Sequence, residues 1–276
     1  MLLIGGLGED LSCWSDVFVD ALVTHGYRIV RPDNRDSGRS SRIDRRPPGP
    51  LRQLFAHPRS DAYTLREMAS DHVGLLDYLD IESAHVVGRS MGGMIAQSLA
   101  ANLSDRVTTL TSIYSTTGAQ DVGQPTVKTK LMLIGSPPPK NRDRAIESHL
   151  TMLRHLSGRT YPMHEVTETQ LAGTVWDRAN GANADGVARQ IQAIHASGDR
   201  TAELGRITVP TLVLNGDRDL IVDPSGGLAT AKSIAHARHV IVPGMGHHLH
   251  DLLAQYVADA IHTLVTTEAA VSASDD

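Results

Sequence analysis

Short apolar runs alternate along this chain with longer segments in which apolar residues recur at helical spacing. The runs have the length and composition of buried strands. They are Leu2–Ile4, Tyr27–Val30, His85–Gly88, Val107–Ile113, Val209–Leu214 and Arg238–Val242. Buried strands that alternate with helices predict a parallel sheet with helices on both faces. The predicted fold class is therefore α/β, with a mostly parallel, doubly wound sheet.

The segments between these runs predict the helices. Amphipathic spacing places helices at 14–25, 64–79, 94–103, 229–235 and 249–265. Thr64 and Glu67 have the spacing of a capping box, in which each side chain bonds the other's backbone N–H. Residues 115–205 break the alternation, because they contain helix-like stretches and a run of three prolines but few strand signals. We therefore expect a core formed by residues 1–114 and 206–276, with residues 115–205 as a helical insert.

The strongest local signal for chemistry is Gly88-Arg89-Ser90-Met91-Gly92, which lies between a predicted strand and a predicted helix. This G-x-S-x-G pattern, in this context, is typical of a nucleophilic serine on a tight strand-to-helix turn. The turn projects the Ser90 hydroxyl above the carboxyl end of the sheet. The backbone N–H of Met91, at the start of the helix, would be free to stabilise an oxyanion.

A serine nucleophile needs a general base and a carboxylate that orients it. In this fold class both are expected at the ends of later strands, in the order serine, acid, histidine. The acid loop contains Asp217 and Asp219, and we favour Asp219 because it precedes an apolar run that can anchor the loop. For the base we favour His247, which directly follows Gly246 in a tight loop. His248 and His250 are the alternatives, and we expect them to fall on the following helix.

A second oxyanion donor is expected in the loop after the first strand. Gly5-Gly6-Leu7-Gly8 suits this role, since glycines let backbone N–H groups turn inward, and we assign the donor to Leu7. The same glycines lack the lysine and the spacing of a nucleotide-binding loop, so no cofactor is expected. His247, His248, His250 and Asp251 lie close together in sequence, but a triad explains His247 better than a metal site does.

Composition narrows the class of partner. The 276 residues carry a net charge of −5 with acidic and basic residues interspersed, which does not suggest a nucleic-acid surface. Cys13 is the single cysteine, so no intramolecular disulfide can form. Neither a signal peptide nor an apolar stretch long enough to span a bilayer is evident. We therefore expect a cytoplasmic protein, without an integral membrane segment, that acts on a small molecule.

These motifs together resemble the α/β-hydrolase superfamily over nearly the whole chain. The likeness is strongest to aclacinomycin methylesterase-like proteins and to the lipase G-type carboxylesterases of mycobacteria. The residues that carry it are Leu2–Gly8, Arg31–Ser40, His85–Gln97, Pro224–Gly227 and Pro243–His247. The resemblance implies a serine esterase that works through an acyl-enzyme, with residues 115–205 as a cap. It also implies a triad of Ser90, Asp219 and His247, with Leu7 and Met91 as oxyanion donors. A cofactor-free perhydrolase, a carbon–carbon bond hydrolase and a non-catalytic ligand-binding protein of the same fold are the alternatives.

The sequence departs from the family pattern at two points. Arg89 stands where relatives often carry His, Tyr or a small residue, and it could pair with a carboxylate or favour anionic substrates. Family members also usually have two strands before the one that begins here at Met1. Without them, Tyr27–Val30 would form an exposed sheet edge that could pair with a second copy of the chain in a homodimer. A start upstream of Met1 is the other interpretation, and it leaves the cytoplasmic prediction open.

Overall fold

The computed structural model of the protein describes residues 1–49, 52, 56–135 and 137–272. It contains a five-stranded sheet in which every pairing is parallel and the spatial order follows the chain order. The strands are β1 (Leu2–Ile4), β2 (Ala84–Arg89), β3 (Val107–Ile113), β4 (Thr211–Gly216) and β5 (Arg238–Val242). The predicted α/β class with a parallel sheet is confirmed. Parallel strands bring all their carboxyl ends to one edge of the sheet, where ligands bind in such folds.

The strand predicted at Tyr27–Val30 is wrong. In the structure only Val30 pairs with the sheet, through an isolated parallel bridge to Leu2. Its N–H donates to the Met1 carbonyl and its carbonyl accepts from the Leu3 N–H, both at 2.9 Å. Pro32 follows closely and has no N–H to donate, so the pairing does not extend further. Pro210 similarly delays β4, which begins at Thr211 rather than at Val209.

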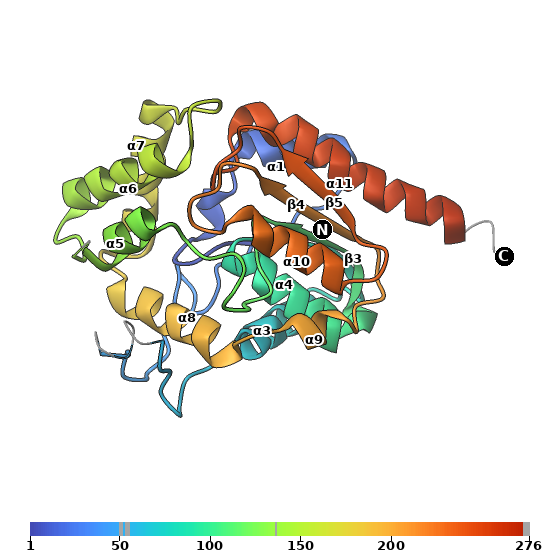
Figure 1. Ribbon diagram of the computed structural model, residues 1–276, viewed down its shortest axis with the longest axis horizontal. Helices are drawn as coiled ribbons and strands as arrows, with labels where there is room; N and C mark the ends of the chain where they lie inside the picture. Colours follow the sequence, from blue (N-terminus) through green and yellow to red (C-terminus); the bar gives the residue numbers. More distant parts are fainter. Residues whose placement is uncertain (50–51, 53–55, 136, 273–276) are drawn as a thin grey trace.

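Helices cover both faces of the sheet, as expected (Figure 1). One face carries α1 (Asp16–Thr24) and α11 (Asp251–Ser272), and the other carries α3 (Leu65–Tyr78), α4 (Met91–Asn102) and α10 (Pro224–Ser233). Side chains alternate between faces along a strand. Leu2 and Val86 accordingly pack in the α3–α4 cluster, whereas Leu3 and Val87 pack against α1 and α11.

Local sequence sets the ends of these helices. Thr64 and Glu67 form the predicted capping box at the start of α3. The last two helices differ from their predicted bounds. Helix α10 begins at Pro224, because the Asp223 carboxylate accepts the Ser225 N–H and proline suits the first helical turn. Helix α11 runs seven residues beyond the predicted end at Val265, to Ser272.

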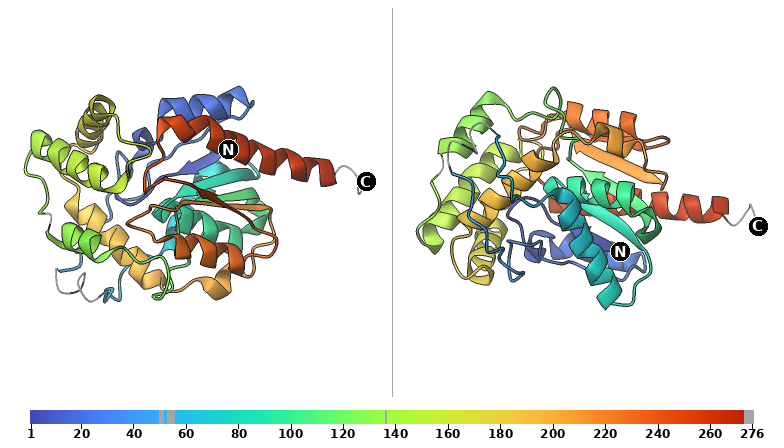
Figure 2. Two further views of the ribbon diagram at one scale, coloured as in Figure 1. Left: turned by 45° about the horizontal axis from the view of Figure 1, so that its top comes forward. Right: turned by 90° about the horizontal axis from the view of Figure 1, so that it is seen from below.

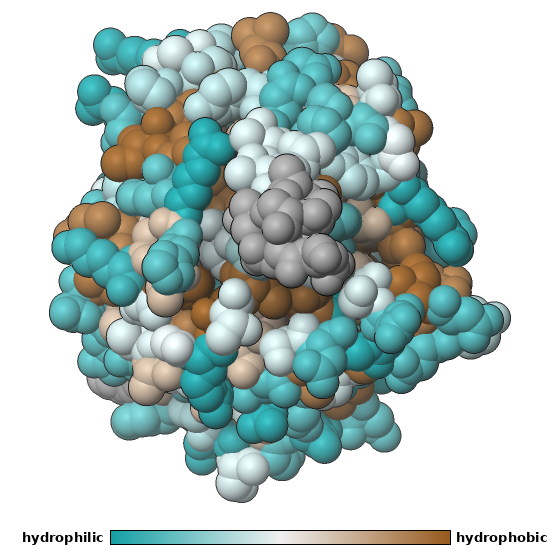
Figure 3. Space-filling view, turned by 90° about the vertical axis from the view of Figure 1, so that its right-hand side faces the viewer, coloured by the Kyte–Doolittle hydropathy of each residue, from teal (hydrophilic) through white to brown (hydrophobic). Residues whose placement is uncertain are grey.

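Between β3 and β4 the described part of the chain forms helices joined by loops and contains no strand. The helices are α5 (Val127–Gly135), α6 (Arg142–Leu156), α7 (Glu165–Arg178), α8 (Ala184–Ser197) and the short α9 (Thr201–Leu204). Two further single turns, η1 (Leu11–Cys13) and η2 (Ser104–Arg106), precede α1 and β3. Helices α5–α7 lie at the end of the molecule opposite the carboxyl terminus (Figures 1 and 2). The face at that terminus shows hydrophilic and apolar residues interspersed (Figure 3).

Candidate active site

Ser90 lies on the turn between β2 and α4. Its backbone has φ 53° and ψ −123°, a conformation that costs energy for a residue with a side chain. Its N–H donates to the Ile113 carbonyl at 2.9 Å, which fixes the turn against β3. The flanking glycines are needed for space, since a Cβ at Gly88 would collide with the Gly92 carbonyl and one at Gly92 with the Ile4 carbonyl. The G-x-S-x-G pattern is therefore explained by close backbone approach.

The structure brings Ser90, His247 and Asp219 together, although they are far apart in sequence. His247 Nε2 lies 2.9 Å from Ser90 Oγ, and His247 Nδ1 lies 2.6 Å from Asp219 Oδ2. The Asp219 side chain is fully buried and that of His247 is about one-tenth exposed. Ser90 follows the carboxyl end of β2, Asp219 that of β4 and His247 that of β5. This arrangement matches a nucleophile, a base within hydrogen-bonding reach, and a carboxylate that orients the base.

The two aspartates of the acid loop have different partners. Asp219 Oδ1 accepts the N–H groups of Ile221 and Val222 at 2.8 Å each, which aims the second oxygen at His247. Asp217 Oδ1 instead accepts the Gly244 N–H at 2.6 Å and so joins the acid loop to the histidine loop. The apolar run after Asp219, on which its assignment depended, supplies both of these N–H donors.

The three histidines of the loop after β5 also have different partners. His250 Nε2 donates to the Pro162 carbonyl at 2.9 Å, and His248 Nε2 lies 3.6 Å from Glu168 on α7. The His247 N–H donates to the carbonyl of Leu156, at the end of α6, at 3.2 Å. The helices after β3 therefore contact the loop that carries the histidine.

Leu7 and Met91, the predicted oxyanion donors, belong to the segments next to the Ser90 side chain and to Ser90 itself, respectively. A Cβ at Gly6 would lie 3.3 Å from Ser90 Cβ, so the loop after β1 packs directly against the serine. The N–H groups of Gly6 and Gly8 are occupied by Glu9 Oε2 and Gln190 Oε1. Within the described residues neither the Leu7 nor the Met91 N–H has a hydrogen-bond acceptor. Met91 is the first residue of α4, where N–H groups lack partners within the helix.

Sequence analysis missed two residues beside this cluster. Tyr114, directly after β3, packs its ring 4.6 Å from the His247 ring, and Glu9 forms an ion pair with Arg89 at 2.8 Å. Of the two roles considered for Arg89, the structure shows pairing with a carboxylate. A position immediately after a parallel strand was the signal available for Tyr114. No pattern in the sequence marks Glu9.

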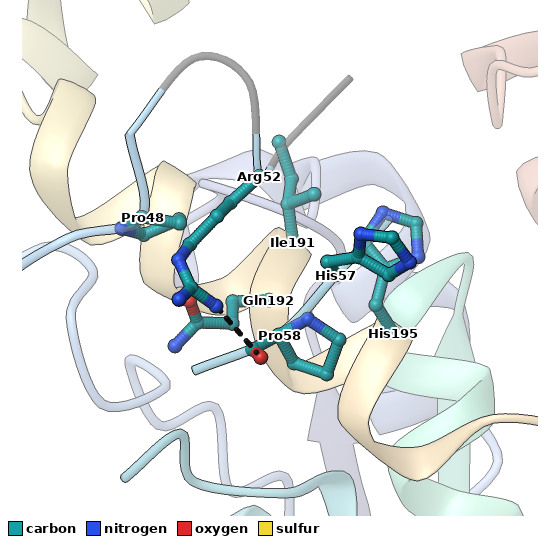
Figure 4. A pocket seen from close by; sticks show the side chains of 7 residues that line it. All are labelled: Pro48, Arg52, His57, Pro58, Ile191, Gln192 and His195. Carbon is teal, nitrogen blue, oxygen red and sulfur yellow. Dashed lines mark hydrogen bonds between the residues drawn. The ribbon is translucent and has the colours of Figure 1, made fainter. Parts of the chain in front are cut away.

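Other features of the described chain bear on function. A small pocket with a volume of about 10 Å³, space for about one water, is lined by Pro48, Arg52, His57 and Pro58 together with Ile191, Gln192 and His195 of α8 (Figure 4). None of the predicted site residues lines it. Within the described residues, no three His, Cys, Asp or Glu side chains are placed to hold a metal ion. No helix in the same part of the chain is long and apolar enough to cross a membrane.

The chain is similar to known hydrolases over most of its length. The family model for the alpha/beta hydrolase fold matches residues 1–252. Rhodomycin D methylesterase DnrP of Streptomyces peucetius is 32% identical, over 97% of this chain and 91% of its own. A 2-hydroxy-6-oxononadienedioate/2-hydroxy-6-oxononatrienedioate hydrolase of Paraburkholderia phymatum is 29% identical, over 90% of this chain and 80% of its own. The enol-lactonase of Burkholderia xenovorans superposes with a TM-score of 0.68 at 28% identity, covering 96% of this chain and 89% of its own.

The resemblance that the motifs suggested is thus supported over nearly the whole chain, including its likeness to the methylesterases. Relatives with several hydrolytic activities support a hydrolase. The chain belongs to the alpha/beta hydrolase fold family.

Proposed function

We propose that this protein is a serine esterase that hydrolyses a small-molecule carboxylic ester through an acyl-enzyme. The observation that carries the proposal is the hydrogen-bonded chain from Ser90 Oγ through the His247 ring to the buried Asp219. The similarity to rhodomycin D methylesterase supports an ester as the substrate class. The triad performs this chemistry without a cofactor.

The first half-reaction forms the acyl-enzyme. His247 Nε2 takes the proton of Ser90 as Oγ attacks the ester carbonyl, and Asp219 stabilises the imidazolium at Nδ1. The N–H groups of Leu7 and Met91 would stabilise the oxyanion, each by about 3 kcal/mol in the transition state. His247 then returns the proton to the leaving alcohol. In the second half-reaction it activates a water that releases the acid and frees Ser90.

Residues 115–205 are proposed as the cap over this site, with 1–114 and 206–276 as the core. Leu156 and Glu168 already contact the histidine loop, which supports a position of α6 and α7 beside Ser90. The apolar side chains of these helices differ in exposure. Leu153 and Leu156 are buried on α6, whereas Leu133 on α5 is about half exposed.

Hydrolysis of p-nitrophenyl esters from acetate to palmitate tests the proposal. We expect Ser90→Ala to lower kcat by roughly 10⁴–10⁶-fold with an unchanged circular dichroism spectrum. Ser83→Ala is the matched control, because it removes an exposed hydroxyl at the opposite end of the same strand. Esterase activity retained by Ser90→Ala would contradict the assignment.

A carbon–carbon bond hydrolase with the same triad is the second candidate, favoured by the 29% identity to the Paraburkholderia phymatum hydrolase. The two candidate activities use the same catalytic residues and differ only in the substrate. Turnover of a 2-hydroxy-6-oxo-dienoic acid, with no turnover of any ester in the series, would favour it. Ser90→Ala should abolish either activity.

A further inference from the structure

A partly buried ion pair lies directly beside the proposed nucleophile. Arg89 Nε lies 2.8 Å from Glu9 Oε2, and the arginine side chain is 8% exposed while that of Glu9 is 30% exposed. The Trp14 ring covers the guanidinium at 4.8 Å. Buried ion pairs are often no more stabilising than apolar residues of similar volume, so stability alone does not explain this one. An arginine so enclosed and so paired is also unsuited to binding an anionic substrate.

The carboxylate of this pair also holds the loop after β1. Glu9 Oε2 accepts the Gly6 N–H at 2.5 Å, in the residue immediately before Leu7. A Cβ at Gly6 would lie 2.9 Å from the same oxygen and 3.3 Å from Ser90 Cβ. The Glu9 carboxylate is therefore fixed between the proposed oxyanion loop and residue 89. It fixes the Gly5–Gly6 peptide, and the backbone N–H of Glu9 donates to the Gly6 carbonyl at 3.3 Å, in the peptide that carries the Leu7 N–H.

The cation of the pair reaches toward the base. Burial raises the pKa of the Tyr114 phenol, and the neighbouring Arg89 guanidinium acts in the opposite direction. Tyr114 in turn packs against the His247 ring. Burial acts to lower the pKa of Arg89, but the charge of Glu9 leaves it raised, so the guanidinium stays ionised. Contacts thus run from Gly6 through Glu9, Arg89 and Tyr114 to the imidazole.

We propose that Glu9 and Arg89 form a positioning pair for the hydrolytic reaction, an inference that rests on the proposed function. The Glu9 carboxylate holds the loop that leads to Leu7 by accepting the Gly6 N–H, and Arg89 neutralises this carboxylate beside Ser90 and His247. An unpaired Glu9 charge would oppose the developing oxyanion and favour the imidazolium. An unpaired Arg89 charge would have the opposite effect on the imidazole.

Several other titratable groups lie around His247 and are not substituted in the test. They are Asp219 after β4, Tyr114 after β3, His248 next along the chain, and Glu168 on α7, which contacts His248 and His149. Arg89 also acts on the pKa values of Tyr114, Glu168 and His248, so a shift of the midpoint reports the effect of the pair together with its effect through these neighbours.

The test is the rate at which a fluorophosphonate labels Ser90 between pH 5 and 9, which requires the base and the oxyanion donors but no known ester. On the acid side of this range the labelling rate should fall as the base becomes protonated, and we call this part of the pH profile the acid limb. We expect Glu9→Gln to move this limb down in pH and Arg89→Met to move it up, each by about 0.5–1 unit. The double variant should return it to the wild-type midpoint. Each single variant should also slow labelling about 10–100-fold, as expected for a displaced oxyanion donor.

Two further variants serve as controls, one that keeps the charge at residue 89 and one that removes a different ion pair. Arg89→Lys keeps the charge and should leave the midpoint in place while slowing labelling, even if Arg89→Met fails to fold. Arg106→Met removes an ion pair with Asp77 before β3, away from the Ser90 turn, and should change neither readout. Midpoints that do not move, or that move in the same direction in both single variants, would overturn the positioning pair. Wild-type protein in which Ser90 is not labelled at all would instead overturn the proposed function.

Discussion

The carboxyl edge of the sheet and the helices α7 and α8 face each other in this molecule but are held by different kinds of contact. At the sheet edge, backbone packs on backbone, because a Cβ at Gly88, Gly92 or Gly216 would collide with a carbonyl of a neighbouring segment. Helix α7 buries only Glu168, Ala172 and Gly173, and it is tied to the core through charges. Arg178, near its end, pairs with Asp10 at 2.6 Å and with Asp33 at 2.8 Å.

Helix α8, like α7, is attached to the core through an ion pair. Its Arg189 forms a pair of hydrogen bonds with the fully buried Asp36, which also accepts the Tyr63 hydroxyl at 2.9 Å. These partners are more than 140 residues from the helices in sequence. The sheet edge is thus encoded by motifs of about five residues, whereas the attachment of α7 and α8 depends on long-range polar pairs that no local pattern reveals.

The largest expected effect lies at the sheet edge, where two aspartates in one loop differ in partner and in burial. Asp219→Asn should keep the bonds from Ile221 and Val222 but present the wrong group to His247 Nδ1, and lower kcat by about 10⁴-fold. Asp217→Asn is the matched control. Its carbonyl oxygen can still accept the Gly244 N–H, so kcat should stay within a few-fold of wild type. Steady-state kinetics on the best ester decide the matter, and equal losses would show that the loop acts as one unit.

The same difference between regions explains what could be predicted from the sequence. Strands and loops at the sheet edge carry their signals locally, so the parallel sheet and the cluster of Ser90, Asp219 and His247 could be located in advance. Tyr27–Val30 has strand-like composition, but pairing there depends on the neighbour and on Pro32, and only one residue joins the sheet. The partner of Arg89 could not be predicted, because Glu9 is 80 residues away and lies in a glycine-rich loop with no charge pattern.

A smaller effect is expected from breaking the attachment of α7. Arg178→Met leaves two nearly buried carboxylates without their cation, which should cost about 3 kcal/mol of unfolding free energy. For a chain of this length the melting temperature should fall by about 6–12 °C. Arg144→Met on α6 removes an exposed pair with Glu147 and should shift it by less than about 2 °C. Differential scanning calorimetry measures both.

Labelling of Ser90 sharpens this comparison. If the sheet edge is built locally, Arg178→Met should still react with a fluorophosphonate at temperatures below its transition. A folded Arg178→Met protein that has lost labelling would show that the triad depends on the helices for its geometry. Equal melting temperatures for the two variants would show that the polar attachment contributes little.

An effect confined to acid pH, and small near neutrality, is expected where the two regions meet, at His248 and Glu168. Burial lowers the pKa of His248 to about 4, so its ring is neutral in the folded protein while the unfolded chain titrates near 6.5. The unfolded state therefore binds more protons below pH 6.5, and stability should fall between pH 6.5 and 4 by up to about 1.4 kcal/mol per unit. Burial acts to raise the pKa of Glu168, but the hydrogen bond from His149 leaves it lowered, which adds a loss on the acid side.

His248→Gln should flatten this decline, since glutamine has no proton to gain, while leaving stability at pH 8 nearly unchanged. His236→Asn is the control, because His236 is exposed and asparagine tolerates its positive φ. Urea unfolding at half-unit steps of pH gives the slope for each protein. Parallel curves for wild type and His248→Gln would mean that the histidine is accessible to protons in the folded state. The contact between α7 and the histidine loop would then open while the sheet stays folded. The two regions would therefore differ in their local stability as well as in the kind of contact that holds them.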